Sequence, residues 1–478
     1  MGITVVGLGP GNGRLLTREA WEILSSARTV YLRTARHPTV ADLPEAVACQ
    51  SFDHLYETAV AFDDVYQQIV AELLNLAQAG DVVYAVPGHP FVAESTVTGL
   101  VSAAEEAGVA VRIVDGLSFV EPTLTAVRVD GLEGVQLYDA IAVTGFEYPP
   151  FNPDAPVLLG QVYSRMLASE LKLVLTAVYP DEHPVKLVHA LGSEDELVER
   201  IPLYEIDRSP HINHLTSLFI PALLHKSSLT SLAETVAVLR SPEGCPWDQE
   251  QTPQSMRDDF LGEVAEVMEA LDTGDVENLA EELGDVLFHL VFQAQMAAEM
   301  EDFRLTDVVA GVEAKLRRRH PHVWGDWEAD DARQVEANWE EIKKAEKGET
   351  AVSILDNVPL SLPALAHAQK IQKRAAKVGF DWPTIEGVYA KLAEEVEEIK
   401  TAVTPEEIQS EVGDLLFSAV NLARWLEVNA EIALREATLK FNGRFRAVER
   451  LVVERGLVWE ELDLAALDAL WNEAKGLP

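Results

Sequence analysis

The strongest constraint on the fold is an acidic pattern that occurs twice in the second half of the 478-residue chain. Positions three apart on an α-helix lie on one face, so each pair of acids can point at the same ion. Two copies are too few for a solenoid, and the pattern therefore predicts a tandem duplication of one helical domain. The first copy reads Glu263-Val-Ala-Glu266 and Glu282-Leu-Gly-Asp285, and the second reads Glu395-Val-Glu-Glu398 and Glu411-Val-Gly-Asp414.

Helical periodicity and further repeated residues support this interpretation. Apolar side chains follow the i, i+3, i+4, i+7 spacing of a helix stripe, which predicts that they are buried. The two stripes are Val264, Val267, Met268 and Leu271, then Leu283, Val286, Leu287 and Leu290. Each copy also has a Lys-xxx-Arg pair and a later tryptophan, which are Lys315, Arg319 and Trp339 in the first copy and Lys440, Arg444 and Trp471 in the second.

Before about residue 220 the chain has a different texture, because short β-rich runs alternate with helical stretches. This alternation predicts an α/β domain with a largely parallel sheet. The expected strands are Ile3–Val6, Thr29–Leu32, Asp81–Val86, Val109–Val114 and Lys172–Val178, and the expected helices include Thr17–Ala27 and Asp63–Ala79. The predicted fold is therefore multidomain, with an N-terminal α/β region followed by two all-α helical bundle domains.

The expected domain boundaries follow from these changes in pattern. We expect the α/β domain over residues 1–222, the first helical domain over 226–347 and the second over 364–478. The segment 348–363 is the expected linker, because it loses the helical period and contains Pro359 and Pro363.

The repeated acids suggest a metal site. Asp272-Thr-Gly274-Asp275 is a turn signal that would pack the two acidic helices of the first copy together. Four carboxylates then converge across a helix pair, and oxygen ligands without cysteine favour Mg²⁺ or Mn²⁺ over zinc. A lone ExxE on a Glu-rich helix is more often solvated surface, but each ExxE here precedes an ExxD on an otherwise apolar helix, where acids are costly unless used.

The helical half resembles the MazG family of nucleoside triphosphate pyrophosphohydrolases, whose signature is ExxE followed by ExxD. Further matching motifs are Gly244-Cys-Pro-Trp-Asp248, Arg318-Arg-His-Pro-His322, Lys370-Ile-Gln-Lys-Arg-Ala-Ala-Lys-Val-Gly-Phe-Asp-Trp382 and Asn421-Leu-Ala-Arg424. The resemblance implies Mg²⁺-dependent cleavage of a nucleoside triphosphate between its α and β phosphates. The implied metal ligands are Glu263, Glu266, Glu282 and Asp285 in the first copy and Glu395, Glu398, Glu411 and Asp414 in the second.

The two copies differ at a position that matters for this chemistry. Lys391 lies four residues before Glu395 and matches a phosphate-contacting lysine of the family, whereas the first copy has Asp259 at that offset. We therefore expect the second copy to be the stronger catalyst, with Lys391, Lys440 and Arg444 supplying positive charge to the phosphoryl oxygens. Lys315 and Arg319 are the corresponding candidates in the first copy, while Trp471 fits equally a base-stacking role and a core position.

The N-terminal region contains three glycine-bearing loops, each after an expected strand. They are Gly7-Leu-Gly9-Pro10-Gly11-Asn-Gly13, Val86-Pro87-Gly88-His89-Pro90-Phe91 and Val114-Asp-Gly116-Leu-Ser118-Phe119. Because ligands collect at the carboxyl ends of strands, the three loops can converge on one cleft. Together they resemble the tetrapyrrole methylase family, which binds S-adenosylmethionine between two α/β lobes. The implied contacts are Gly9, Pro10, Pro87, Gly88, His89, Ser118 and Phe119.

His89 departs from that family, which usually has an acid after this glycine. Contacts to the methyl donor through the backbone tolerate the change from an acid to histidine. A role of the acid side chain toward the methyl acceptor would be lost. Two functions therefore stay open. One is a pyrophosphohydrolase that cleans nucleotide pools and carries an accessory α/β domain. The other is an S-adenosylmethionine-dependent methyltransferase whose helical domains serve dimerisation or regulation. A degenerate methylase retained for assembly is a further alternative.

Composition narrows the partners and the compartment. The net charge of −41 argues against nucleic-acid or membrane-surface binding, and no apolar run is long enough to span a bilayer. Only Cys49 and Cys245 are present, too few for a disulfide framework or a zinc site. We expect a cytoplasmic homodimer whose partners are nucleoside triphosphates.

Overall fold

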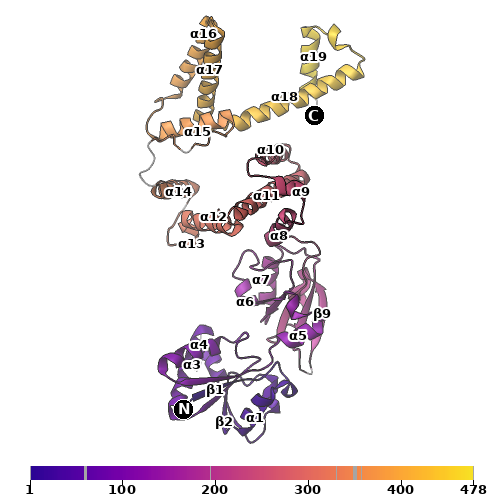
Figure 1. Cartoon of the computed structure of the whole chain (residues 1–478), viewed down its shortest axis with the longest axis vertical. Helices are drawn as coiled ribbons and strands as arrows, with labels where there is room; N and C mark the ends of the chain where they lie inside the picture. Colours follow the sequence, from indigo (N-terminus) through magenta and orange to yellow (C-terminus); the bar gives the residue numbers. More distant parts are fainter. Residues whose placement is uncertain are drawn as a thin grey trace. The chain divides into compact units, whose positions relative to one another are not determined.

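The computed structural model describes residues 2–58, 62–193, 195–329, 331–347, 353–356 and 358–476. Contacts group the chain into two compact units, residues 1–251 and 252–478. The first unit contains two β-sheets and the second is helical, which confirms the predicted fold class (Figure 1). No helix among the described residues has the length and apolar character that crossing a membrane demands.

The first lobe of the α/β unit is built on a fully parallel sheet with strand order β3-β2-β4-β1-β5. Its strands are β1 (Gly2–Gly7), β2 (Thr29–Leu32), β3 (Ala48–Ser51), β4 (Val82–Val86) and β5 (Ala110–Val114). Its helices are α1 (Arg18–Ser26), α2 (Asp53–Thr58), α3 (Phe62–Ala79) and α4 (Ser95–Ala107). Four of the five predicted strands and both predicted helices are thus confirmed.

Side chains alternate along the strands of this sheet and build a core on each face. Ile3 and Val5 of β1 pack with Ile69 and Leu73 of α3, while Val6 faces a separate cluster that contains Leu24 of α1. Helices on both faces of a parallel sheet leave only its strand ends open. The carboxyl ends of the strands are therefore available for a ligand.

The second lobe has a mixed sheet of order β6-β7-β10-β8-β9, in which only β6 and β7 run parallel. Its strands are β6 (Gln136–Asp139), β7 (Val157–Gly160), β8 (Pro184–His189), β9 (Leu197–Pro202) and β10 (Thr216–Ile220). Its helices are α5 (Val120–Val127), α6 (Ala140–Val143) and α7 (Arg165–Leu175). Short 3₁₀ helices in this unit span Gly13–Leu15, Pro38–Asp42, Gly131–Glu133 and Leu203–Arg208.

One strand prediction is wrong. Lys172–Val178 was expected to form a strand, yet its first residues complete helix α7. The run is rich in apolar side chains, but Leu167, Leu171 and Leu175 recur every four residues and are buried against the second sheet. Helical spacing over a longer window therefore decides the conformation.

A serine-rich segment joins this lobe to the next helix, α8 (Leu229–Arg240). The Asp154 carboxylate accepts hydrogen bonds from the backbone N–H of Ser227 at 2.8 Å, from the Ser228 hydroxyl at 2.5 Å and from the Ser231 hydroxyl. Despite the desolvation that opposes it, these bonds lower the pKa of Asp154 well below its usual range. Contacts group α8 and the following α9 (Pro246–Glu250) with the α/β unit, although the sequence pattern turns helical near residue 226.

The helical unit contains two similar hairpins. In the first, α10 and α11 are joined at Gly274, whose φ of +70° ends α10 in the left-handed conformation, as the turn signal predicted. In the second, α16 and α17 are joined by a short loop, and Thr404 and Glu407 form a capping box that starts α17. The bounds are α10 (Arg257–Thr273), α11 (Val276–Glu299), α16 (Ile385–Thr401) and α17 (Pro405–Trp425).

Further helices follow each hairpin. They are α12 (Leu305–Arg319), α13 (Pro321–Trp324), α14 (Ala332–Lys347), α15 (Ala364–Lys377), α18 (Ala430–Glu454) and α19 (Leu464–Ala474), with a 3₁₀ turn at Trp459–Glu461. Gln369 of α15 fixes the start of α18, because its side chain donates to the Val428 carbonyl at 2.6 Å and accepts from the Ala430 N–H at 3.0 Å. Of the expected linker, residues 348–352 and 357 lie outside the described residues.

The apolar stripes of the first hairpin are more exposed than the sequence predicted. Leu271, Leu283 and Leu290 are each about half exposed, and Val264 and Leu287 also reach the surface. The prediction of a buried stripe is therefore wrong for these five residues. Periodicity identifies an apolar helix face but does not show what covers it.

Candidate functional site

The first acidic quartet lies across the α10–α11 hairpin, as the sequence predicted. One carboxylate oxygen from each of Glu263, Glu266 and Glu282 lies within 4.8 Å of the others. Glu282 is buried, with 7% of its surface exposed, while Asp285 is exposed and stands outside this group of three. The local spacing therefore brings three of the four predicted ligands together.

Mutual repulsion is the main electrostatic property of this quartet. Burial, followed by the charges of Glu266 and Glu263, raises the pKa of the Glu282 carboxyl. Among the described residues, no lysine or arginine forms an ion pair with any member of the quartet. Clustered oxygen donors that lack a counter-charge suit a hard divalent cation such as Mg²⁺ or Mn²⁺, so the residues fit the metal that the sequence implied.

The second quartet has the same plan across α16 and α17. Glu395, Glu411 and Asp414 each place one carboxylate oxygen within 4.8 Å of the other two. Glu395 is buried, Glu411 is half-buried and Asp414 is exposed. Glu398 lies beside them, and burial together with the charges of Glu395 and Glu411 raises its pKa despite the opposing effect of Lys391.

Lys391 is the feature that separates the two quartets. Its ammonium lies 2.8 Å from Glu395 Oε1, 2.9 Å from Glu394 Oε1 and 4.0 Å from Glu398 Oε2. The hydrogen bonds to Glu395 and Glu394 raise the pKa of Lys391, which keeps it charged. The lysine that the sequence analysis selected thus contacts the acids of its own hairpin.

The remaining predicted phosphate contacts lie on other helices. Lys315 and Arg319 are on α12, and Lys440 and Arg444 are on α18. Among the described residues, these four form no ion pair with either quartet. Trp471 of α19 lies 5.2 Å from the Phe441 ring, beside the apolar cluster between α18 and α19.

Arg319 belongs to a second feature of the first copy. Its guanidinium pairs with Glu346 at 2.5 Å and lies 5.4 Å from the centre of the Trp339 ring. With Lys315 it lines a cavity of about 480 Å³ between α12 and α14. Sequence reasoning proposed both cations but not this cavity, because it depends on how α14 returns to α12.

The glycine-bearing loops of the α/β unit meet at the carboxyl ends of β1, β4 and β5. Gly9 and Gly88 exchange backbone hydrogen bonds of 3.2 and 2.9 Å. A Cβ added at Gly116 would lie 2.5 Å from the Gly88 carbonyl oxygen, so only glycine allows this approach. The predicted convergence of the three loops is therefore seen in the structure.

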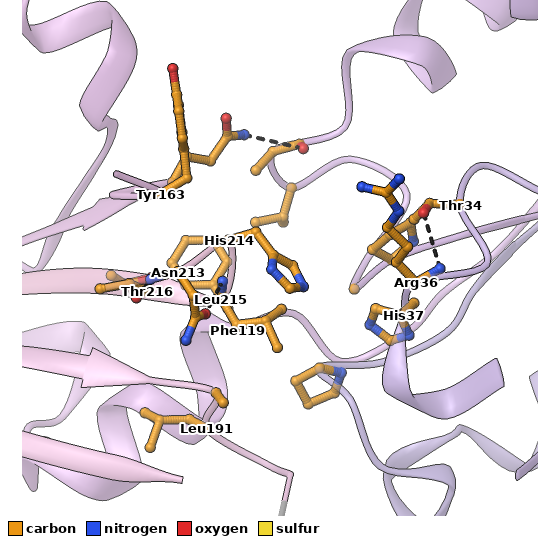
Figure 2. A pocket seen from close by; sticks show the side chains of 18 of the residues that line it. Thr34, Arg36, His37, Phe119, Tyr163, Leu191, Asn213, His214, Leu215 and Thr216 are labelled. Carbon is orange, nitrogen blue, oxygen red and sulfur yellow. Dashed lines mark hydrogen bonds between the residues drawn. The ribbon is translucent and has the colours of Figure 1, made fainter. Parts of the chain in front are cut away.

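A cavity of about 750 Å³ opens beside these loops (Figure 2). Five of the seven predicted cofactor contacts line it, namely Gly9, Pro10, Pro87, Gly88 and Phe119. The other two are engaged elsewhere. His89 Nε2 lies 3.5 Å from Asp115, and the Ser118 hydroxyl donates to Glu121 at 2.7 Å at the start of α5.

Several cavity residues were missed from the sequence. His37 and His214 project toward the cavity from opposite sides in Figure 2. Burial, followed by the electrostatic effect of His214, lowers the pKa of His37 to about 4, which keeps the His37 imidazole neutral at pH 7. Arg33 also lines the cavity, and the only sequence signal for it is its position directly after strand β2.

Arg33 is held by one buried carboxylate and two half-buried tyrosines. Its Nη1 lies 3.0 Å from the Oε2 of Glu94, whose side chain has no solvent exposure. Its Nε donates to the Tyr56 hydroxyl at 3.1 Å, and its guanidinium lies 5.6 Å from the centre of the Tyr66 ring. Burial raises the pKa of Glu94 even with this guanidinium beside it.

Two family models match the sequence. The model described as Tetrapyrrole (Corrin/Porphyrin) Methylases matches residues 2–207, and the MazG nucleotide pyrophosphohydrolase domain matches residues 251–324 and 384–448. A nucleoside triphosphate pyrophosphohydrolase of Escherichia coli strain K12 is 48% identical over 244 residues, which cover 50% of this chain and 93% of that protein. The chain belongs to the MazG family. It carries a tetrapyrrole methylase domain ahead of its MazG domains.

Two further relatives show how this arrangement is distributed. The nucleoside triphosphate pyrophosphohydrolase/pyrophosphatase MazG of Thermotoga maritima is 46% identical over 245 residues, covering 51% of this chain and 94% of its own. The uncharacterized protein YabN of Bacillus subtilis strain 168 is 41% identical over 482 residues, covering 99% of this chain and 98% of its own. This similarity therefore extends over both the methylase region and the MazG regions of the chain. Both quartets and Lys391 lie inside the ranges that the MazG model matches.

Proposed function

We propose that this protein hydrolyses nucleoside triphosphates to nucleoside monophosphates and pyrophosphate, with Mg²⁺ or Mn²⁺ as cofactor, and that it clears unwanted nucleotides from the cytoplasmic pool. The carrying observation is the second quartet, where Glu395, Glu411 and Asp414 converge beside Lys391. The MazG relatives from Escherichia coli and Thermotoga maritima carry names that agree with this reaction. The net charge of −41 argues against a nucleic acid or a membrane surface as the partner.

The residues of the second hairpin would divide the work as follows. A divalent cation bound at the quartet would neutralise the triphosphate and activate water for attack at the α phosphorus. Glu395, Glu411 and Asp414 would hold the cation, and Glu398, whose raised pKa suits proton transfer, would accept the proton of the attacking water. Lys391 stabilises charge on the phosphoryl oxygens, and Lys440, Arg444 and Trp471 are expected to reach the substrate only when it is bound.

The products of the reaction test this proposal. Nucleoside triphosphate incubated with the protein and Mg²⁺ should give monophosphate and pyrophosphate, and chelation of the metal should stop the reaction. Chromatography that found diphosphate and orthophosphate instead would contradict cleavage between the α and β phosphates.

The two quartets are expected to contribute unequally. Glu398→Ala should lower turnover by about 100-fold or more, because it removes the group proposed to accept the proton of the attacking water. Glu266→Ala should lower it much less, since the first copy has Asp259 where the second has Lys391. Glu397→Ala is the matched control, because this exposed acid pairs with Lys400 at 2.7 Å. Equal losses from the Glu398 and Glu266 variants would contradict the asymmetry.

The α/β unit supports a second activity. The cavity beside the loops at Gly9 and Gly88 favours S-adenosylmethionine or its demethylated product as a ligand, as in a methyltransferase. Backbone contacts from these loops tolerate His89. Calorimetric titration of the full chain with S-adenosylmethionine is the test, and absence of heat at millimolar ligand would leave a degenerate domain retained for assembly.

The exposed stripes support a homodimer. Leu283 and Leu290 of α11 and Leu416 of α17 are half exposed on helices that carry the quartets. Leu283 and Leu290, seven residues apart, lie on one helix face, and large apolar side chains exposed in this way are typical of an interface. Sedimentation velocity should therefore show a species of twice the chain mass, and a monomer at micromolar concentration would contradict the proposal.

A further inference from the structure

Both quartets place acids at the same spacings within each helix of a pair, and the residue four positions before the first acid carries opposite charge in the two copies. Lys391 lies four residues before Glu395, and Asp259 lies four residues before Glu263. Positions i and i+4 are neighbours on a helix, so each residue stands beside the first acid of its quartet. The second quartet therefore has a resident cation where the first has an additional acid.

The Lys391 ammonium is in direct contact with acids of the second quartet. Lys391 Nζ binds Glu395, whose side chain is only 4% exposed, and Glu395 is one of the three acids that converge. The lysine side chain itself is 34% exposed, so its ammonium can leave without unfolding the helix. A lysine ammonium is a compact charge on a flexible stem, which suits movement between two anionic partners.

The first quartet offers the contrasting case. Glu282 is buried among Glu263 and Glu266, and among the described residues no lysine or arginine pairs with them. The described residues of the first hairpin thus provide no basic side chain that pairs with its quartet as Lys391 does in the second. A divalent cation at the first quartet would meet no resident competitor.

We propose that Lys391 is a mobile counter-ion of the second quartet, which holds the site until a triphosphate draws its ammonium away and thereby couples metal binding to nucleotide binding. The first quartet, with Asp259, binds a divalent cation without nucleotide. This inference rests on the proposed function in taking a divalent cation as the ligand of the quartets and a nucleoside triphosphate as the anion. By linkage, the nucleotide strengthens metal binding at the second quartet as much as the metal strengthens nucleotide binding.

Mn²⁺ binding to the full chain, followed by electron paramagnetic resonance, tests the proposal without turnover. Glu263→Gln/Glu266→Gln leaves the second quartet to be measured, and Glu411→Gln/Asp414→Asn leaves the first. In the protein that retains the second quartet, Lys391→Met should tighten nucleotide-free Mn²⁺ binding by about tenfold, because it removes a unit charge close to the ligands. Lys391→Arg, which keeps the charge, should not.

Two further measurements complete the experiment. Asp259→Lys, in the protein that retains the first quartet, should weaken nucleotide-free Mn²⁺ binding by about tenfold, because it introduces the missing charge. An α,β-methylene nucleoside triphosphate, which cannot be cleaved, should tighten Mn²⁺ binding at the second quartet more with Lys391 than with Lys391→Met.

Equal Mn²⁺ affinity with Lys391 and with Lys391→Met would overturn the proposal, as would equal enhancement by the nucleotide analogue. Thermal unfolding of each variant, unchanged from its parent, shows that an altered affinity does not reflect a damaged hairpin. Failure of the proposed function is detected in a separate assay, in which a cleavable nucleoside triphosphate yields no pyrophosphate. The changes in Mn²⁺ affinity test only the role of Lys391.

Discussion

Replacing Arg33 by methionine tests whether the cavity wall depends on one buried ion pair. Arg33 Nη1 lies 3.0 Å from Glu94 Oε2, and the Glu94 side chain is fully buried. Methionine keeps much of the side-chain volume but leaves the carboxylate with only the hydrogen bonds from Thr96. Removing one partner of a buried ion pair costs about 3–5 kcal/mol of unfolding free energy, because the other charge stays uncompensated.

The cost should depend on pH in a defined direction. Burial already raises the pKa of Glu94 with Arg33 present, and loss of the guanidinium raises it further. The folded variant then holds a proton that the unfolded chain releases above its own pKa of about 4.3. Stability is therefore least affected below that value and is lost as pH rises through the raised pKa of the folded state. The free energy of unfolding of Arg33→Met should therefore be lower at about pH 8 than at about pH 5.

Hydrogen exchange measured by mass spectrometry over β1 and β4 reports the stability of this lobe within the full chain. Arg112→Met is the matched control, since Arg112 pairs with Glu19 at the surface and its loss should cost less than about 1 kcal/mol. Arg33→Met combined with Glu94→Gln should lose less than Arg33→Met alone, because no buried charge remains. A cost equal to that of Arg112→Met, or one that does not change with pH, would refute the reasoning.

Three other outcomes are expected from the described contacts. Gly116→Ala should destabilise the first lobe by about 1–3 kcal/mol in urea unfolding, because its Cβ would meet the Gly88 carbonyl. It should also weaken ligand binding in the cavity. Gly80→Ala is the control and should have neither effect, because its Cβ would meet nothing within 4 Å. His37 has a pKa of about 4 in the folded state against about 6.5 when unfolded, so stability present above pH 6.5 should fall by about 2–3 kcal/mol down to about pH 4.5. His37→Gln should remove that part of the slope in unfolding curves. Gln369→Leu should cost about 2–4 kcal/mol, seen as faster hydrogen exchange at the start of α18, because the buried Ala430 N–H and the partly buried Val428 carbonyl lose their partner.

Local patterns predicted the elements well because they are short-range properties of the chain. The strands β1, β2, β4 and β5 follow from β-branched runs bounded by turns, and Gly274 ends α10 as its position implied. The strand expected at Lys172–Val178 failed for the same reason. A window of seven residues saw the apolar run, whereas Leu167 and Leu171, which reveal the helical period, lie before it.

The candidate site was predictable only where it is built from neighbouring turns. Each acidic quartet follows from two spacings of three residues and one turn, and the structure brings together three of the four predicted acids in each copy. The cavity in the α/β unit depends on two lobes, and His37 and His214 carry no local signal that they face one space. The exposure of Leu283 and Leu290 was likewise not predicted, because an apolar helix stripe does not indicate which element packs against it.

The bonds of Asp154 to Ser227, Ser228 and Ser231 have a consequence for how a fused gene of this kind can be divided. Splitting it where the composition changes, near residue 226, would separate Asp154 from these three serines, and Ser228, the N-cap of α8, would lose its bond to the carboxylate. A split between Gln251 and Thr252 leaves the acid and its serines together. Where a gene of this kind is divided in nature, we therefore expect the break to fall after α9. That point lies beyond α8 and α9, the first two helices that follow the last strand.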